Sequence, residues 1–165
     1  MRIKPRELCL LSAAAALMFV LQIVMAPLPN IEPISLFVIL LGCIFGVKAL
    51  FAVAVFVLLE GLLHGFGLWW FFYLYVWPIL LLAVLLLRPM IGESAWGWAL
   101  VSGAFGLCFG LLYALIFLFT GGMQTFLATW IAGFLFDITH CIGNFVLCLC
   151  LYTPLMRIVK KSNLH

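Results

Sequence analysis

The sequence predicts an all-α integral membrane protein with six transmembrane helices and both termini in the cytoplasm, and two observations carry this prediction. Hydrophobic residues make up 68% of the 165 positions and charged residues only 8%, whereas a soluble domain is about half apolar and about a quarter charged. When the chain is divided into six helices, every Lys and Arg falls on the side of the two termini, which the positive-inside rule makes cytoplasmic. A division into five helices loses this pattern.

Breaks rich in proline and glycine separate the expected helices. The three prolines of residues 27–33 end the first helix. As a single helix, residues 34–63 would be about 45 Å long, would exceed the roughly 30 Å bilayer core and would bury Lys48, so we expect a break at Gly46-Val47-Lys48. Turns are also expected at 64–68, 88–96 and 120–124. The predicted helices of this single membrane domain are residues 8–26, 34–46, 48–63, 69–87, 98–119 and 125–155.

Two sets of small residues predict close contacts between helices. Ser12 and Ala16 form a small-xxx-small face on the first helix, and Ser102, Gly106 and Gly110 form a ladder on the fifth. Five of the six cysteines lie inside apolar runs and none forms a CxxC pair. We interpret the cysteines as packing residues, and not as a disulfide framework or a zinc site.

The stretch 60–77, EGLLHGFGLWWFFYLYVW, predicts a binding pocket. Glu60 and His64 lie one helical turn apart, and Trp69, Tyr73 and Trp77 then share one helix face. Aromatic faces with a few polar groups suit a flat, partly polar small molecule.

Two plainer interpretations of this stretch stay open. His64, at a helix end, can be merely interfacial. Trp69, Trp70 and Tyr73 can form an aromatic belt at the outer headgroups. A belt suits Trp70 well, but it suits Trp77 less, because Trp77 lies two turns deeper.

The last predicted helix places Asp137, His140 and Asn144 on one face. Ionisable groups inside a membrane are expensive and usually face a bundle interior or a cavity. In the alternative interpretation, Asp137 and His140 pair with each other or with a neighbouring helix, and Asn144 also holds helices together. Asp137-xx-His140 is a weak metal signal, and neither HExxH nor GxSxG is present. We expect no catalytic residue, metal or cofactor. An intramembrane enzyme is the weakest functional hypothesis.

Taken together, the small-residue first helix, the loop PLPNIEPIS, the turn GFGLWW and the segment FDITHCIGNF resemble the substrate-binding S components of bacterial energy-coupling factor (ECF) transporters. The resemblance covers nearly the whole chain in layout. It implies a plasma-membrane protein that binds a vitamin or related micronutrient from outside, under its outward loops. It also implies partners: a transmembrane coupling subunit, on which the first helix docks through a small patch, and two cytoplasmic ATPases. Here Ser12-xxx-Ala16 stands where the family has Ala-xxx-Ala, and the chain has no P-loop of its own.

The resemblance gives the polar and aromatic residues expected roles. Glu60 and Asp137 suit an amine, a cationic ring or N–H donors, and the aromatic row suits a ring. Asn30 and Glu32, with the glycine-rich loops at 64–68 and 120–124, would form a lid. The expected substrate is a small heterocycle such as a pyrrolopyrimidine queuosine precursor, thiamine or a pyridoxine relative. The full expected binding set is Asn30, Glu32, Glu60, His64, Trp69, Tyr73, Trp77, Asp137, His140 and Asn144.

The rival hypothesis is a structural scaffold. Small multispan rod-shape proteins of bacteria are similar in size and helix count, and they bind other proteins instead of nutrients. Such a scaffold would not need an outward pocket of aromatic and carboxylate side chains.

Overall fold

The computed structural model describes residues 3–28 and 31–161, and this part of the chain is helical with no strand. This confirms the predicted all-α class. The elements in chain order are α1 (Pro5–Met25), α2 (Ile34–Phe45), the short 3₁₀ helix η1 (Gly46–Lys48), α3 (Ala49–His64), α4 (Leu68–Ile91) and α5 (Ala95–Lys161).

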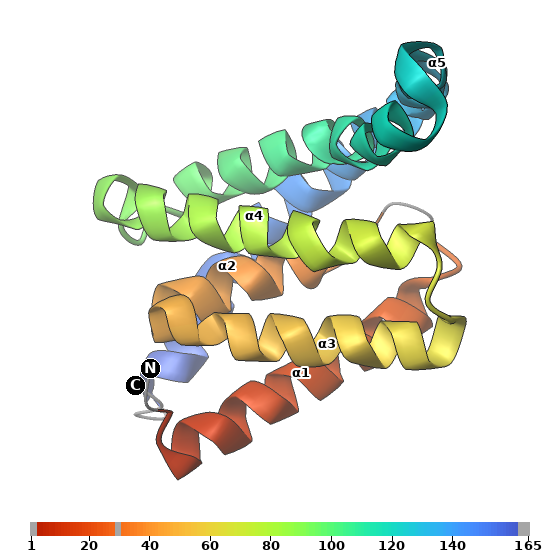
Figure 1. Ribbon diagram of the computed structural model, residues 1–165. Coiled ribbons are helices and arrows are strands. Elements are labelled where there is room, and N and C mark those ends of the chain that lie inside the picture. The colour runs from red at the N-terminus through yellow and green to blue at the C-terminus, as the bar shows by residue number, and fades with distance from the viewer. Residues whose placement is uncertain (1–2, 29–30, 162–165) are drawn as a thin grey trace.

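The long helix α5 consists of two segments that meet at a bend. Gly122 has φ 74° and ψ −176°, a non-helical conformation inside the element, and positive φ is readily adopted only by glycine. We call residues 95–121 the first arm of α5 and residues 123–161 its second arm. In Figure 1 the second arm folds back along the first and returns to the end of the bundle where the chain began.

Four stretches are long and apolar enough to cross a membrane, by length and composition: α1, the continuous stretch from α2 to α3, α4 and α5. These helices fit a transmembrane protein. The turn at η1 divides the second stretch and the bend at Gly122 divides the fourth. The crossing of a bilayer by six separate segments therefore stays a prediction.

The breaks fall near the predicted positions, but the predicted loops at 64–68, 88–96 and 120–124 are shorter than expected, and the first has only residues 65–67 between α3 and α4. α1 begins at Pro5, three residues before the predicted start, because a proline suits the first helical turn. α4 continues through Arg88 and Pro89 to Ile91, so the polar turn expected at 88–96 shrinks to residues 92–94. Gly92, at φ 59°, ends this helix. At 120–124 the structure has only the bend, and the flanking residues are helical.

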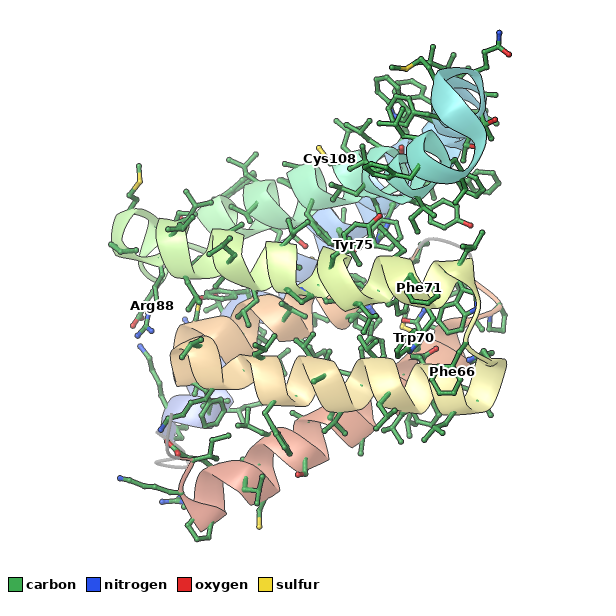
Figure 2. The ribbon with its side chains drawn as sticks, in the orientation of Figure 1. Phe66, Trp70, Phe71, Tyr75, Arg88 and Cys108 are labelled. Atoms are coloured by element: carbon green, nitrogen blue, oxygen red, sulfur yellow. The ribbon has the colours of Figure 1, made fainter. Side chains whose placement is uncertain are left out.

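The basic residues gather at one end of the bundle. The described Lys and Arg lie before or in the first turn of α1, at the α2–α3 turn, near the end of α4 and in the last turns of α5, which are together at one end in Figure 1. Figure 2 shows Arg88 at this end and Phe66 and Trp70 at the other. Lys48 Nζ lies 2.7 Å from Glu7 Oε1, and Lys160 pairs with Glu93. We call this the basic end of the bundle.

Helix α1 lies at the edge of the bundle and packs mainly on α3. Leu11, Ala15 and Met18 recur every three or four residues and are fully buried, so they form the packed face of α1. Ser12 and Ala16 lie on another face and are exposed.

The two arms of α5 cross in close contact at the predicted ladder of small residues. A Cβ atom added at Gly106 would lie 2.8 Å from the backbone carbonyl carbon of His140, and one added at Gly110 would lie 2.5 Å from both Asp137 carboxylate oxygens. Only glycine lets the backbones approach this closely. The contact is directional as well, because the Gly110 N–H donates a 2.8 Å hydrogen bond to Asp137 Oδ1.

We predict that Gly106→Ala lowers the thermal midpoint of the purified protein. The added methyl would collide with backbone atoms that cannot rotate away, and overpacking of this kind costs about 1–3 kcal/mol. Gly133→Ala is the matched control, because a Cβ at Gly133 meets nothing within 4 Å and alanine is the better helix former. Thermal unfolding in detergent measures both variants, and equal midpoints would mean that the two arms do not meet at this ladder.

Candidate functional site

A cavity of about 360 Å³ lies near the end of the bundle opposite the basic end. Its lining comes from the last turns of α1 and α3 and the start of α4, namely Gln22, Ile23, Ala26, Glu60, His64, Trp69 and Tyr73. Pockets for small molecules span roughly 300–1,000 Å³, so this cavity accepts a small ligand. Four of the predicted binding residues thus line one space.

Glu60 is the buried acid of this cavity. Its side chain is 4% exposed, and Oε2 lies 3.3 Å from Nδ1 of His64, whose own side chain is half exposed. Glu60 Oε1 is buried and has no hydrogen-bond partner among the described residues. One carboxylate oxygen of Glu60 is therefore unpaired among the described residues.

The predicted aromatic row exists and runs inward from the cavity. Trp69 and Tyr73 meet edge to face at 5.4 Å between ring centroids, and Tyr73 and Trp77 do so at 5.5 Å. Phe56 of α3 stacks on Tyr73 from the other side at 6.2 Å. Trp77 is fully buried, so it cannot belong to a belt at the headgroups.

Trp70, which suited an aromatic belt, also has a role in helix packing. Its indole N–H donates a 2.9 Å hydrogen bond to the Val57 carbonyl on α3, and its ring meets Phe66 edge to face. A Cβ at Gly61 would lie 2.4 Å from the Phe66 ring. This contact fixes the start of α4 against the end of α3, as the labelled side chains in Figure 2 show.

Glu32 connects the segment before α2 to the second arm of α5. Its Oε1 lies 3.3 Å from Nε2 of His140, and both side chains are largely buried. The His140 ring packs on Phe109 at 4.6 Å, and Phe109 in turn packs on Trp77. Glu32 is also near enough to Glu60 and Tyr73 for electrostatic interaction with both. The residues from the last helix thereby reach the inner end of the aromatic row.

Asp137 and Asn144 lie in contacts between helices. Asp137 binds the Gly110 N–H in the crossing of the two arms. Asn144 Nδ2 donates to Ser35 Oγ at 3.0 Å and to the Ser102 carbonyl at 3.4 Å. These contacts fit the alternative interpretation of both residues as polar links between helices.

Unpaired polar atoms concentrate in the predicted binding set. More than about 90% of buried polar atoms in proteins have a hydrogen-bond partner. Six of the seven exceptions among the described residues belong to that set, and the seventh is Gln22 in the cavity wall. Glu32 Oε1 and His140 Nε2 are among them because their contact lacks hydrogen-bond geometry. Only Gln22 and Glu60 of these residues line the cavity, and a ligand or ordered water can satisfy unpaired atoms of this kind. The seven atoms are Gln22 Oε1, Glu32 Oε1, Glu60 Oε1, Trp77 Nε1, Asp137 Oδ2, His140 Nε2 and Asn144 Oδ1.

Some residues at the cavity were not predictable from the sequence. Asn30 lies outside the described residues. Gln22, a single polar residue in an apolar helix, was noticeable in the sequence, but its place in the cavity wall depends on how α1 packs. Phe56 and Phe109 carried no signal, because sixteen phenylalanines are spread over this sequence. No group of three or more His, Cys, Asp or Glu side chains suited to a metal ion exists in the described part of the chain.

Comparison of the chain with protein families, with curated proteins and with solved structures found no match.

We predict that neutral substitution of Asp137 lowers the thermal midpoint in the absence of ligand and that neutral substitution of Glu60 does not. Asp137→Ala removes the bond from Gly110 and opens space in the arm crossing, so it should lower the thermal midpoint. Glu60→Gln removes a buried charge whose contact, His64, is half exposed, so it should leave the midpoint unchanged or raise it. Thermal unfolding in detergent after extensive washing tests this, and a large loss of stability in Glu60→Gln would make Glu60 a packing residue.

Proposed function

We propose that this protein is the substrate-binding component of an ECF-type importer and that it binds a small heterocyclic micronutrient. The observation that carries the proposal is the cavity itself, which is lined by a buried carboxylate with an unpaired oxygen and by aromatic rings at one end of a bundle of apolar helices. Burying a carboxylate is expensive in a membrane and usually has a functional reason.

The charges around the cavity favour a ligand that is cationic or rich in N–H donors. Glu60 lines the cavity and Glu32 lies near it, whereas the described Lys and Arg gather at the opposite end of the bundle. Electrostatic attraction is stronger in such a low-dielectric place than in water. An anionic ligand would be repelled by an ionised Glu60 or Glu32.

The aromatic wall favours a ring in the ligand. Trp69 and Tyr73 line the cavity, and Trp77 and Phe56 support Tyr73 from behind. A supported aromatic surface keeps its orientation, so stacking a flat ring on it loses little side-chain freedom. A scaffold of the rod-shape type has no use for this arrangement.

The positions of the basic end and of the cavity, at opposite ends of the bundle, support a role in import. If the basic end is cytoplasmic, the cavity opens outward and receives its ligand from outside. Energy would come from the coupling subunit and two ATPases of the ECF class. Ser12 and Ala16 are exposed on the free face of α1, where a partner helix can approach closely.

The experiment that tests the proposal begins with mass spectrometry of small molecules that copurify with the protein in detergent. With the molecule identified, we predict that Glu60→Gln weakens its binding about ten- to a hundredfold, the loss of one charge-assisted hydrogen bond of roughly 1.5–3 kcal/mol. Titration followed by tryptophan fluorescence or calorimetry measures the affinity.

Glu93→Gln is the matched control for this prediction. Glu93 is an exposed acid at the basic end, paired with Lys160, so its neutralisation should leave the affinity unchanged. A purified protein that carries no small molecule and binds none of the candidate heterocycles would contradict the proposal, and the rod-shape scaffold would then be the better explanation.

We predict that Ala16→Phe stops uptake in cells while the purified protein still binds its ligand. The phenylalanine would hold a partner helix away from α1, but it lies outside the cavity lining. Uptake of labelled ligand by cells and titration of the pure variant separate the two effects. Loss of ligand binding in the pure variant would assign this face of α1 another role.

A further inference from the structure

The basic end of the bundle has two adjoining cavities that the proposed import function does not use. One has a volume of about 260 Å³ and is lined by Lys4, Arg6, Glu7 and Lys48 together with Leu10, Ile44 and Phe45. The other also has a volume of about 260 Å³, and its walls are apolar side chains of α1, α2 and the end of α5. The two cavities share Leu10, Ile44 and Phe45. We call them the basic cavity and the apolar groove.

We propose that the basic cavity and the apolar groove together bind one anionic phospholipid, with its phosphate in the former and an acyl chain in the latter. A charged space that opens directly into an apolar one matches the two parts of such a molecule. Its expected place is the leaflet on the side of the basic end.

The charge of the basic cavity favours an anion. Three cationic side chains face a single carboxylate there. Lys48 is bound by Glu7, whose two oxygens lie 2.7 and 2.8 Å from Nζ. Neither Lys4 nor Arg6 forms an ion pair through its side chain with a described residue, and both are exposed. Within the described part of the chain these two side chains have no ion pair, so they suit a phosphate, and each Lys or Arg near a membrane surface attracts anionic lipid by about 1 kcal/mol.

The dimensions of the apolar groove favour an acyl chain. From Phe37 to Phe45 the groove follows α2 for about 12 Å, close to the roughly 15 Å depth of one leaflet of the hydrocarbon core. The groove is lined by Leu10, Ala13, Ala14, Leu17, Phe37, Leu40, Leu41, Ile44, Phe45, Leu155, Ile158 and Val159.

The wall of the groove on α1 is distinct from the face proposed to meet the coupling subunit. At about 100° per residue, Leu10, Ala13, Ala14 and Leu17 point roughly 130° away from the mean direction of Ser12 and Ala16. Lipid binding and partner docking therefore use different sides of one helix. Neither involves the cavity at Glu60, so the proposal does not depend on the import function.

The test is a titration of the full-length protein in detergent, followed by native mass spectrometry, with dioleoylphosphatidylglycerol and dioleoylphosphatidylcholine as probes. We expect one phosphatidylglycerol to bind, more tightly than phosphatidylcholine. The double variant Lys4→Gln/Arg6→Gln should weaken phosphatidylglycerol binding about thirtyfold, or about fivefold per charge, and leave phosphatidylcholine unchanged. Ala13→Phe should fill the groove and weaken both lipids.

Two matched variants control for charge and for bulk. Lys161→Gln removes an exposed cation from the same end, and Ala104→Phe adds the same ring to an exposed position on α5; neither residue lines the basic cavity or the groove. Both should bind lipid like the unaltered protein, and a thermal midpoint for each variant shows that it is folded. Equal binding of the two lipids, an equal loss in Lys161→Gln, or full binding in Ala13→Phe would overturn the proposal.

Discussion

The close crossing of the two arms of α5 is the contact on which the rest of the site depends. Gly106 lies against the His140 backbone and Gly110 against the Asp137 carboxylate, and the hydrogen bond from Gly110 to Asp137 fixes the position of one arm along the other. With the arms in this register, His140 meets both Phe109 and Glu32. Asn144 likewise meets Ser35. A Cβ at Gly106 or Gly110 would lie under 3.0 Å from atoms of the second arm, so the contact between the arms would have to shift.

The polar residues inside the bundle divide into two groups by what they contact. Asp137 and Asn144 already bind backbone or side-chain partners on neighbouring helices, as polar residues in membrane bundles commonly do. Glu60 has only a half-exposed imidazole beside it, and its second oxygen is unpaired. The first group fixes helix positions, although Asp137 Oδ2 and Asn144 Oδ1 are also unpaired, whereas Glu60 pairs only with His64 among the described side chains. The Glu32 carboxylate, which contacts His140, interacts electrostatically with Glu60, and a ligand contact for Asp137 stays a prediction.

The two ends of the bundle have opposite charge. One end has Glu32, Glu60 and an aromatic wall, and suits a small cation. The other has the described Lys and Arg, and its adjoining cavities suit a phosphate with an acyl chain. The helices between them are apolar enough to cross a bilayer. Each end thus favours a ligand of the opposite charge.

The sequence by itself determined the helical class, the approximate breaks and the identity of most of the polar residues at the site. These follow from composition, from helix-breaking residues and from the cost of placing charge in hydrocarbon, all of which are local properties. The row of Trp69, Tyr73 and Trp77 was also predictable, because residues four apart share a helix face. Only the tertiary structure decided which helices face one another. It placed Gln22 of α1 beside Glu60, brought Glu32 to His140, and assigned Asp137 to the arm crossing. Apolar helix surfaces resemble one another in sequence, so the choice among possible packings is made by close contacts such as those of Gly106 and Gly110, which exist only once the chain has folded.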